Sequence, residues 1–90
     1  MKVFINILGA EVRLKQEISL EPASAKLKDV LRSIGDQEKG LLDRFVNKDL
    51  TLVGSSIILI TGRNFLSLDQ WETPIHDGDE ITFMVPVAGG

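Results

Sequence analysis

Residues 76–90 read HDGDEITFMVPVAGG and place a turn, a strand and a glycine-ended tail in one short run. The segment His76–Asp79 is typical of a tight turn, because Asp and Gly accept the backbone angles that turns require. Beyond it, apolar residues alternate with polar ones, which predicts a strand with one buried face. The buried positions of this strand are Ile81, Phe83 and Val85. The tail is therefore expected to leave from the end of a strand.

Upstream of this segment, the sequence predicts two strands and a helix. Val3–Leu8 is rich in β-branched and aromatic residues, which indicates a well-buried strand, and Gln16–Leu20 alternates as a second strand would. A helix is expected between Ser24, as its N-cap, and Gly35, as its C-terminal stop. Its apolar residues recur at helical spacing and are Leu27, Val30, Leu31 and Ile34.

The remaining segments complete an α+β pattern. A second, shorter helix is expected to begin at Asp36, and Ser56–Thr61 indicates a strand that ends at the turn Gly62–Asn64. Residues 65–71 are expected to be irregular. This order predicts a β-grasp fold, with a mixed sheet of four to five strands, one main helix packed across it and a second short helix. The first and last strands are expected side by side at its centre.

The predicted organisation is one β-grasp domain, residues 1–85, followed by a flexible C-terminal tail, residues 86–90. Ninety residues, 43% of them hydrophobic and 26% charged, suit one soluble domain with a modest core. No apolar run is long enough to span a bilayer and no signal-peptide pattern is present, so a cytoplasmic protein without a membrane partner is expected. The absence of cysteine excludes disulfides and thiolate metal ligands, and no metal site is expected.

Charge is spread unevenly along the chain. Residues 1–45 hold eight Lys and Arg against seven Asp and Glu, whereas residues 46–90 hold two against six. An acidic half argues against nucleic acid as a partner, because nucleic-acid binding needs clustered positive charge. The acidic surface indicates either a basic docking surface on a partner or simply a soluble exterior.

The tail has the properties of an end that enters another protein. Glycine lacks the Cβ that would collide with the wall of a narrow channel, and Pro86 stiffens the exit. The five residues beyond Val85 span at most roughly 16–18 Å when extended. The carboxylate of Gly90 is ionised at pH 7 and cannot acylate anything before a partner activates it. The sequence therefore predicts a carrier or a tag.

These features resemble the ubiquitin-like sulfur carriers, which include the small subunit of molybdopterin synthase and the thiamine-pathway carrier. The resemblance covers the element order of the whole chain and rests on Leu68-Asp69, Thr73-Pro74-Ile75, Asp77-Gly78-Asp79-Glu80-Ile81 and Pro86-Val87-Ala88-Gly89-Gly90. At 90 residues the chain is more similar to the molybdopterin-synthase subunit. Many relatives in that branch carry an aromatic residue and two prolines where this chain has Met84–Pro86, and an asparagine is common where Thr61 stands.

The resemblance implies how the tail works. An adenylating enzyme resembling those that activate ubiquitin uses ATP to convert the carboxylate of Gly90 to an acyl-adenylate. A persulfide on another protein then supplies sulfur, and Gly90 becomes a thiocarboxylate. In the molybdopterin branch the tail next enters the large synthase subunit, where its sulfur is transferred to a pterin precursor. The chain is thus expected to be a non-catalytic co-substrate with no bound cofactor, and the residues that enter the partner are Pro86, Val87, Ala88 and Gly89.

Other functions use the same tail or none of it. A sulfur carrier for thiamine or tRNA thiolation, or a modifier joined to lysines through Gly90, needs the same activated acyl group. A β-grasp binding module would make the glycines incidental. The residues expected to contribute to partner docking are Leu59, Arg63, Phe65 and Trp71. Trp71 is explained equally well as a partner anchor and as a cap over the core.

Overall fold

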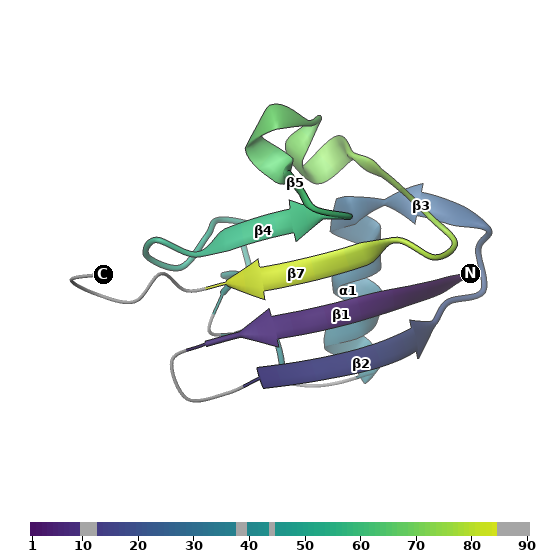
Figure 1. Ribbon diagram of the computed structural model, residues 1–90, viewed down its shortest axis with the longest axis horizontal. Helices are drawn as coiled ribbons and strands as arrows, with labels where there is room; N and C mark the ends of the chain where they lie inside the picture. The colour runs from purple at the N-terminus through teal and green to yellow at the C-terminus, as the bar shows by residue number, and fades with distance from the viewer. Residues whose placement is uncertain (10–12, 38–39, 44, 85–90) are drawn as a thin grey trace.

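The computed structural model describes residues 1–9, 13–37, 40–43 and 45–84. Their main feature is a five-stranded mixed sheet with the order β2-β1-β7-β4-β5 (Figure 1). β1 and β7 are parallel neighbours, and the other strand pairs of this sheet are antiparallel. The prediction that the first and last strands lie side by side at the centre is confirmed. The strands are β1 (Lys2–Leu8), β2 (Arg13–Ser19), β4 (Ile57–Ile60), β5 (Arg63–Asn64) and β7 (Glu80–Met84).

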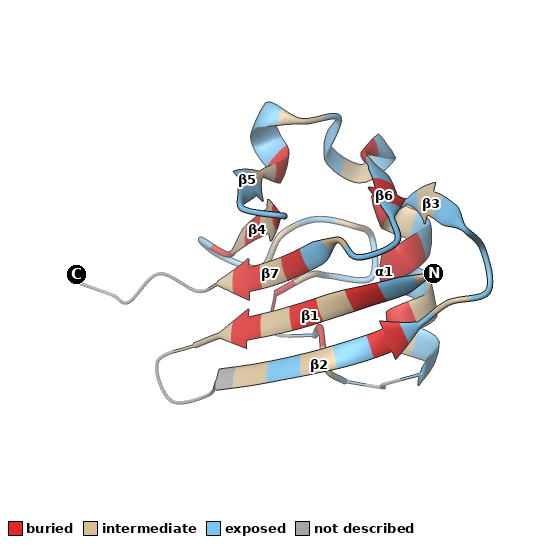
Figure 2. Cartoon of the chain, turned by 45° about the vertical axis from the view of Figure 1, so that its right-hand side comes forward, coloured by how far each residue is buried: buried red, intermediate tan, exposed pale blue. Residues whose placement is uncertain are grey.

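The helix α1 (Leu27–Gln37) packs across one face of the sheet and buries the predicted apolar stripe. Leu27, Val30 and Ile34 are 0% exposed. Along β1 and β7, every second side chain is buried beneath the helix, as the colours of Figure 2 show. Truncating a buried side chain of this kind to alanine typically costs about 2–5 kcal/mol of stability. The alternation that predicted one buried face for the last strand is confirmed by Ile81 and Phe83.

Both ends of the helix differ from the prediction. Ser24 is not its N-cap, because residues 24–26 form the short strand β3 (Ser24–Lys26), which is paired with β6 (Pro74–His76). The helix begins at Leu27, whose N–H donates to the carbonyl of Thr73 at 2.8 Å. Gly35 does not stop the helix, since a glycine inside a helix costs only about 1 kcal/mol relative to alanine.

The second helix expected from Asp36 is not found in the part of the chain that the structure describes. Residues 40–43 and Phe45 form turns and bends, and Val46 forms an isolated antiparallel bridge with Leu52. Gly40 has a φ of +83°, which is incompatible with an α-helix. Phe45 is still 3% exposed, and its ring centroid lies 5.7 Å from that of Phe83. The irregular segment expected at residues 65–71 contains two short 3-10 turns, η1 (Phe65–Ser67) and η2 (Gln70–Glu72).

The hairpin between β4 and β5 turns at Thr61 and Gly62, with φ values of +49° and +81°. The turn thus begins one residue earlier than predicted. A β-branched residue in the left-handed region is strained by roughly 1–2 kcal/mol. The hydroxyl of Thr61 donates to Oδ1 of Asp79 at 2.9 Å, and its N–H donates to the carbonyl of Glu80 at 2.7 Å. These hydrogen bonds hold Thr61 in a backbone conformation that a β-branched residue disfavours.

We expect Thr61→Asn to stabilise the protein by about 1 kcal/mol, because asparagine adopts left-handed angles readily and keeps a polar group near Asp79. Equilibrium unfolding in urea measures this difference. Thr61→Ser is the matched control, since it keeps the hydroxyl and removes only the branching methyl. Its free energy of unfolding should lie between those of the original chain and of Thr61→Asn. An asparagine variant no more stable than the original chain would show that the turn carries no relievable strain.

The topology confirms the predicted α+β, β-grasp fold with one main helix. Val85 and the predicted tail, residues 86–90, lie outside the described residues. The helices that the structure describes include none long and apolar enough to cross a membrane.

Candidate functional site

Met84, the last residue of β7, is paired on both sides. It lies opposite Leu8 of β1 and Ile57 of β4. Because β7 is the middle strand of the sheet, the chain beyond Met84 begins at a position that two neighbouring strands hold. The residues expected to enter a partner, Pro86–Gly90, follow two positions later, and their role stays a prediction.

The sheet face turned away from α1 is apolar around this starting point. The strand register places half-buried apolar side chains from three adjacent strands on that face. They are Phe4, Leu8, Ile57, Leu59 and Met84, which together are called the apolar face below. In Figure 1 this side of the sheet faces the viewer and α1 lies behind it. Leu8, Met84 and Ile57 adjoin across the register at the end of β7, whereas Phe4 lies opposite Glu80 at the start of that strand. Apolar surface on an open sheet face marks interaction sites.

Polar groups fix the strands that carry the apolar face. The side-chain amide of Asn6 donates to Oε2 of Glu80 and to Oγ1 of Thr82, both at 3.2 Å, and so connects β1 to β7. A shallow hollow of about 330 Å³ borders Asn6 and Leu8 towards β2. The face is therefore built on paired, cross-linked strands, and a partner that docks there meets a rigid surface.

The structure divides the four predicted docking residues between different surfaces. Leu59 belongs to the apolar face, where it lies opposite Thr82. Arg63 is exposed, but it pairs with Ile60 and therefore lies on the other face of the hairpin. Of these two residues, Leu59 is the one on the face of Met84, because it lies opposite Thr82, two positions before Met84 in β7.

Phe65 and Trp71 pack on each other. Their ring centroids lie 5.0 Å apart, Phe65 is 3% exposed, and Trp71 is half-buried against the core. Of the two explanations for Trp71, the structure shows the cap over the core. A role of either ring in docking stays a prediction, and the buried Phe65 offers a partner very little surface.

Sequence reasoning did not name Phe4, Leu8, Ile57 and Met84 as docking candidates, although the alternation of the last strand already predicted that Met84 faces away from the core. In Val3–Leu8 only Asn6 is polar, and it marks the open face on which Phe4 and Leu8 also lie. The five apolar residues do not by themselves distinguish this face from the one under the helix. The signal that could have revealed them is their in-register position beside the alternating last strand, where Thr82 and Met84 face away from the core.

A charged cluster fastens η2 to the start of α1. Glu72 accepts hydrogen bonds from Lys26 and Lys28, with N–O distances of 2.7 Å each. The hydrogen bonds from Lys26 and from Lys28, in that order, lower the pKa of Glu72 to about 2, while desolvation opposes them. All three side chains are at least partly exposed, so salt screens these pairs.

We expect the carboxyl of Glu72 to titrate with a midpoint near 2 rather than its usual 4.5, as ¹³C NMR would measure. Because the pKa is lowered in the folded state, the stabilisation is present above pH 4.5 and is lost as the pH falls towards 2. Glu72→Gln should therefore lower the melting temperature at pH 7 and have a much smaller effect at pH 2, where about half of the carboxyl is already protonated. Lys26→Ala is the control, and it should move the midpoint back towards 4.5. A wild-type midpoint of 4.5 would contradict the cluster.

The described residues contain no group of three acidic or histidine side chains placed to hold a metal ion. Their chemistry is that of a surface and a strand end, with no cluster of acid, base and nucleophile on the apolar face. What this arrangement can do is present the segment beyond Met84 to another protein.

Comparison with known proteins places the chain. The profile of the ThiS family matches residues 5–90. The chain belongs to the ThiS family. Small archaeal modifier protein 3 of Haloferax volcanii is 36% identical to this ThiS-family chain over 66 residues, which cover 73% of the chain and 71% of that relative.

Two solved structures are also similar to this ThiS-family chain. Small archaeal modifier protein 1 from Methanosarcina acetivorans is 30% identical, with a TM-score of 0.60 over 99% of this chain and 96% of that one. The complex of subunits 1 and 2 of the molybdopterin-converting factor from Helicobacter pylori contains a chain that is 27% identical, with a TM-score of 0.62 over 100% of both. The family is one of ubiquitin-like sulfur carriers and modifiers, as the motif run predicted.

Proposed function

We propose that this protein is a sulfur carrier whose Gly90 carboxylate is adenylated by a partner enzyme and converted to a thiocarboxylate. We further propose that it serves as the small subunit of molybdopterin synthase and donates this sulfur in the biosynthesis of the molybdenum cofactor. The terminal sulfur of a persulfide on another protein displaces AMP from the acyl-adenylate and forms an acyl disulfide. A thiol then reduces the S–S bond of this disulfide and releases the thiocarboxylate, while ATP is consumed by the activating enzyme. The chain itself needs no cysteine for this role, because the sulfur is bonded to the activated carbonyl carbon of Gly90 and not to a side chain.

The observation that carries the proposal is the family match, which runs through residue 90 and so includes the glycine tail. The structure adds that the chain enters the tail from a central strand with apolar surface around its end. For the pathway, the supporting observation is the similarity over full length to a chain of the Helicobacter pylori complex.

The chain's own contribution is positioning. A partner that binds the apolar face holds the start of the tail at a fixed point. The reacting carboxylate then explores only the volume within one tail length of that point. Holding two reacting groups together in this way replaces an encounter in solution by a local one. Pro86 reduces the entropy that the tail loses when it becomes ordered.

The test is to purify the protein from the cells that make it and to weigh it intact. We expect part of it to end at Gly90 with the mass gain of one oxygen-to-sulfur exchange, and we expect alkylation to block that terminus. To test the pathway, this form is then mixed with a molybdopterin-synthase large subunit and the pterin precursor. Formation of the dithiolene supports the assignment. A chain that never carries sulfur under sulfur-replete growth would contradict the carrier role.

A second candidate function is protein modification, with Gly90 joined to lysines of target proteins. The 36% identity to a small archaeal modifier protein favours it. Both functions begin with the same acyl-adenylate, and they differ in whether sulfur or a lysine amine attacks it. Protease digestion of cell extracts followed by mass spectrometry separates the two, because conjugation leaves Gly-Gly remnants on target lysines. Their loss when the gene is deleted would establish the modifier role.

A further inference from the structure

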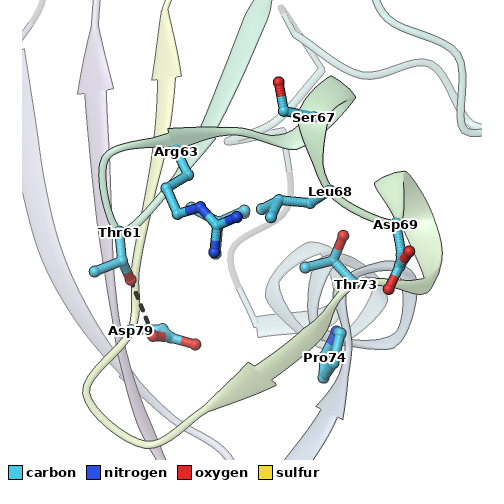
Figure 3. A pocket seen from close by; sticks show the side chains of 9 residues that line it. Thr61, Arg63, Ser67, Leu68, Asp69, Thr73, Pro74 and Asp79 are labelled. Carbon is cyan, nitrogen blue, oxygen red and sulfur yellow. Dashed lines mark hydrogen bonds between the residues drawn. The ribbon is translucent and has the colours of Figure 1, made fainter.

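A separate pocket lies between the β4–β5 hairpin, the two 3-10 turns and β6 (Figure 3). Its volume is about 530 Å³, and its lining includes Arg63, Leu68, Thr73, Pro74 and Asp79. The register places Arg63 opposite Ile60, on the hairpin face away from Leu59, so this pocket is not part of the apolar face.

Arg63 is the cation among the described residues that line this pocket. Its side chain extends from β5 into the hollow, with the guanidinium directed between Thr61, Leu68 and Thr73 (Figure 3). Within the described part of the chain, the guanidinium forms no ion pair or hydrogen bond. A guanidinium presents five donors in a fork that matches a carboxylate.

A second unsatisfied donor lies in the wall of the same pocket. Thr73 is 5% exposed, and its hydroxyl has no hydrogen-bond partner among the described residues. Buried hydroxyls are nearly always hydrogen-bonded, because leaving one unpaired costs its desolvation energy. The hydroxyl oxygen is closed off from solvent, so a ligand's acceptor becomes its missing partner only when the side chains around it move aside.

The acids around the pocket restrict the charge that a ligand can carry. Both oxygens of Asp79 already accept hydrogen bonds, Oδ1 from the hydroxyl of Thr61 at 2.9 Å and Oδ2 from the N–H of His76 at 2.8 Å. Asp69 is exposed and lines the pocket as well. Two nearby negative charges repel a phosphate dianion more strongly than a single carboxylate.

We propose that this pocket binds one side-chain carboxylate, from an aspartate or glutamate of a partner protein. Arg63 holds the carboxylate, the hydroxyl of Thr73 donates a second hydrogen bond, and Leu68 and Pro74 contact the aliphatic part of the side chain. The inference goes beyond the function proposed above and does not depend on it, because none of these residues belongs to the tail.

The experiment uses the full ¹⁵N-labelled chain and follows amide and Arg63 Nε signals by NMR. The probe is N-acetyl-glutamate amide, and the comparison compounds are N-acetyl-glutamine amide and inorganic phosphate. We expect saturable shifts at Arg63, Leu68 and Thr73 with the glutamate compound alone. Arg63→Gln should weaken its binding about tenfold or more, as loss of a charged hydrogen bond does. Arg32→Ala is the matched control, since this exposed arginine pairs with Asp29, and it should leave binding unchanged.

Thr73→Val separates a binding role from a structural one. It removes the unpaired hydroxyl while keeping the shape, so we expect the melting temperature to rise by about 4–8 °C while binding of the glutamate compound weakens. A variant without Gly89 and Gly90 should bind that compound as the full chain does. The proposal is overturned if the shifts do not saturate, if the glutamine compound or phosphate binds equally well, or if the two arginine variants behave alike.

Discussion

Deletion of Gly89 and Gly90 is expected to abolish activation of the protein while leaving its fold intact. The truncated chain would end at Ala88, and its carboxylate would fall short of the partner's active site by about 7 Å, the span of two extended residues. The measurement is ATP–pyrophosphate exchange by the adenylating enzyme, which should fall to background. Circular dichroism and the melting temperature should not change, because the described core ends at Met84.

Ala88→Gly is the control for this deletion. It changes the composition of the tail but keeps its length and its terminal glycine, so exchange should stay close to that of the original chain. The decisive comparison is between these two variants at equal protein concentration. A truncated chain that supported exchange as well as Ala88→Gly would show that the glycines are incidental, which is what a β-grasp binding module requires.

The sequence predicted those elements whose pattern is local. Helical spacing identified Leu27, Val30, Leu31 and Ile34, which are 0–5% exposed, and alternation identified the buried face of the last strand. Each pattern reflects one surface of one element, which a short window of residues already contains. The turn at residues 76–79 was equally local, because Gly78, with a φ of +87°, requires the residue type that stands there.

The errors arose where distant residues decide the structure. Ser24 resembles a helix cap, but Ala25 pairs with Ile75, fifty positions later, and no short window of the sequence contains that pairing. The second helix expected from Asp36 does not form through Gly40, which has a left-handed φ, although Leu42 and Phe45 after it are still buried. Local propensity is a weak prior that tertiary contacts override.

The candidate site was predictable only in part for the same reason. The glycine tail is a sequence feature and could be named directly. The apolar face consists of residues from β1, β4 and β7, and only the strand order brings these three segments together. Leu59 was named as a docking candidate and lies on the apolar face, and its role in docking stays a prediction. Phe4 and Leu8 were expected within a well-buried strand, because all its residues but Asn6 are apolar.

Leu59→Asp is expected to lower the kcat/KM of adenylation by about thirtyfold or more, the effect of losing about 2 kcal/mol at an interface anchor. Leu59 is half-buried on the open side of β4, between Asn64 of β5 and Thr82 of β7. A carboxylate there would have to be desolvated against the partner, while in the free protein it remains in contact with water. The cost to folding should be only about 1 kcal/mol, the range that strand propensity spans. Steady-state adenylation and urea unfolding measure the two effects.

Leu66→Asp is the matched control, because it makes the same chemical change at a leucine that is 61% exposed and lies in η1, outside the apolar face. It should alter neither adenylation nor stability appreciably. If added negative charge anywhere on the chain weakened binding of the adenylating enzyme, both variants would lose activity equally. If the partner bound elsewhere, neither would lose it. Selective loss in Leu59→Asp therefore requires that the partner covers the open side of the central strands, next to the point where the chain enters its tail.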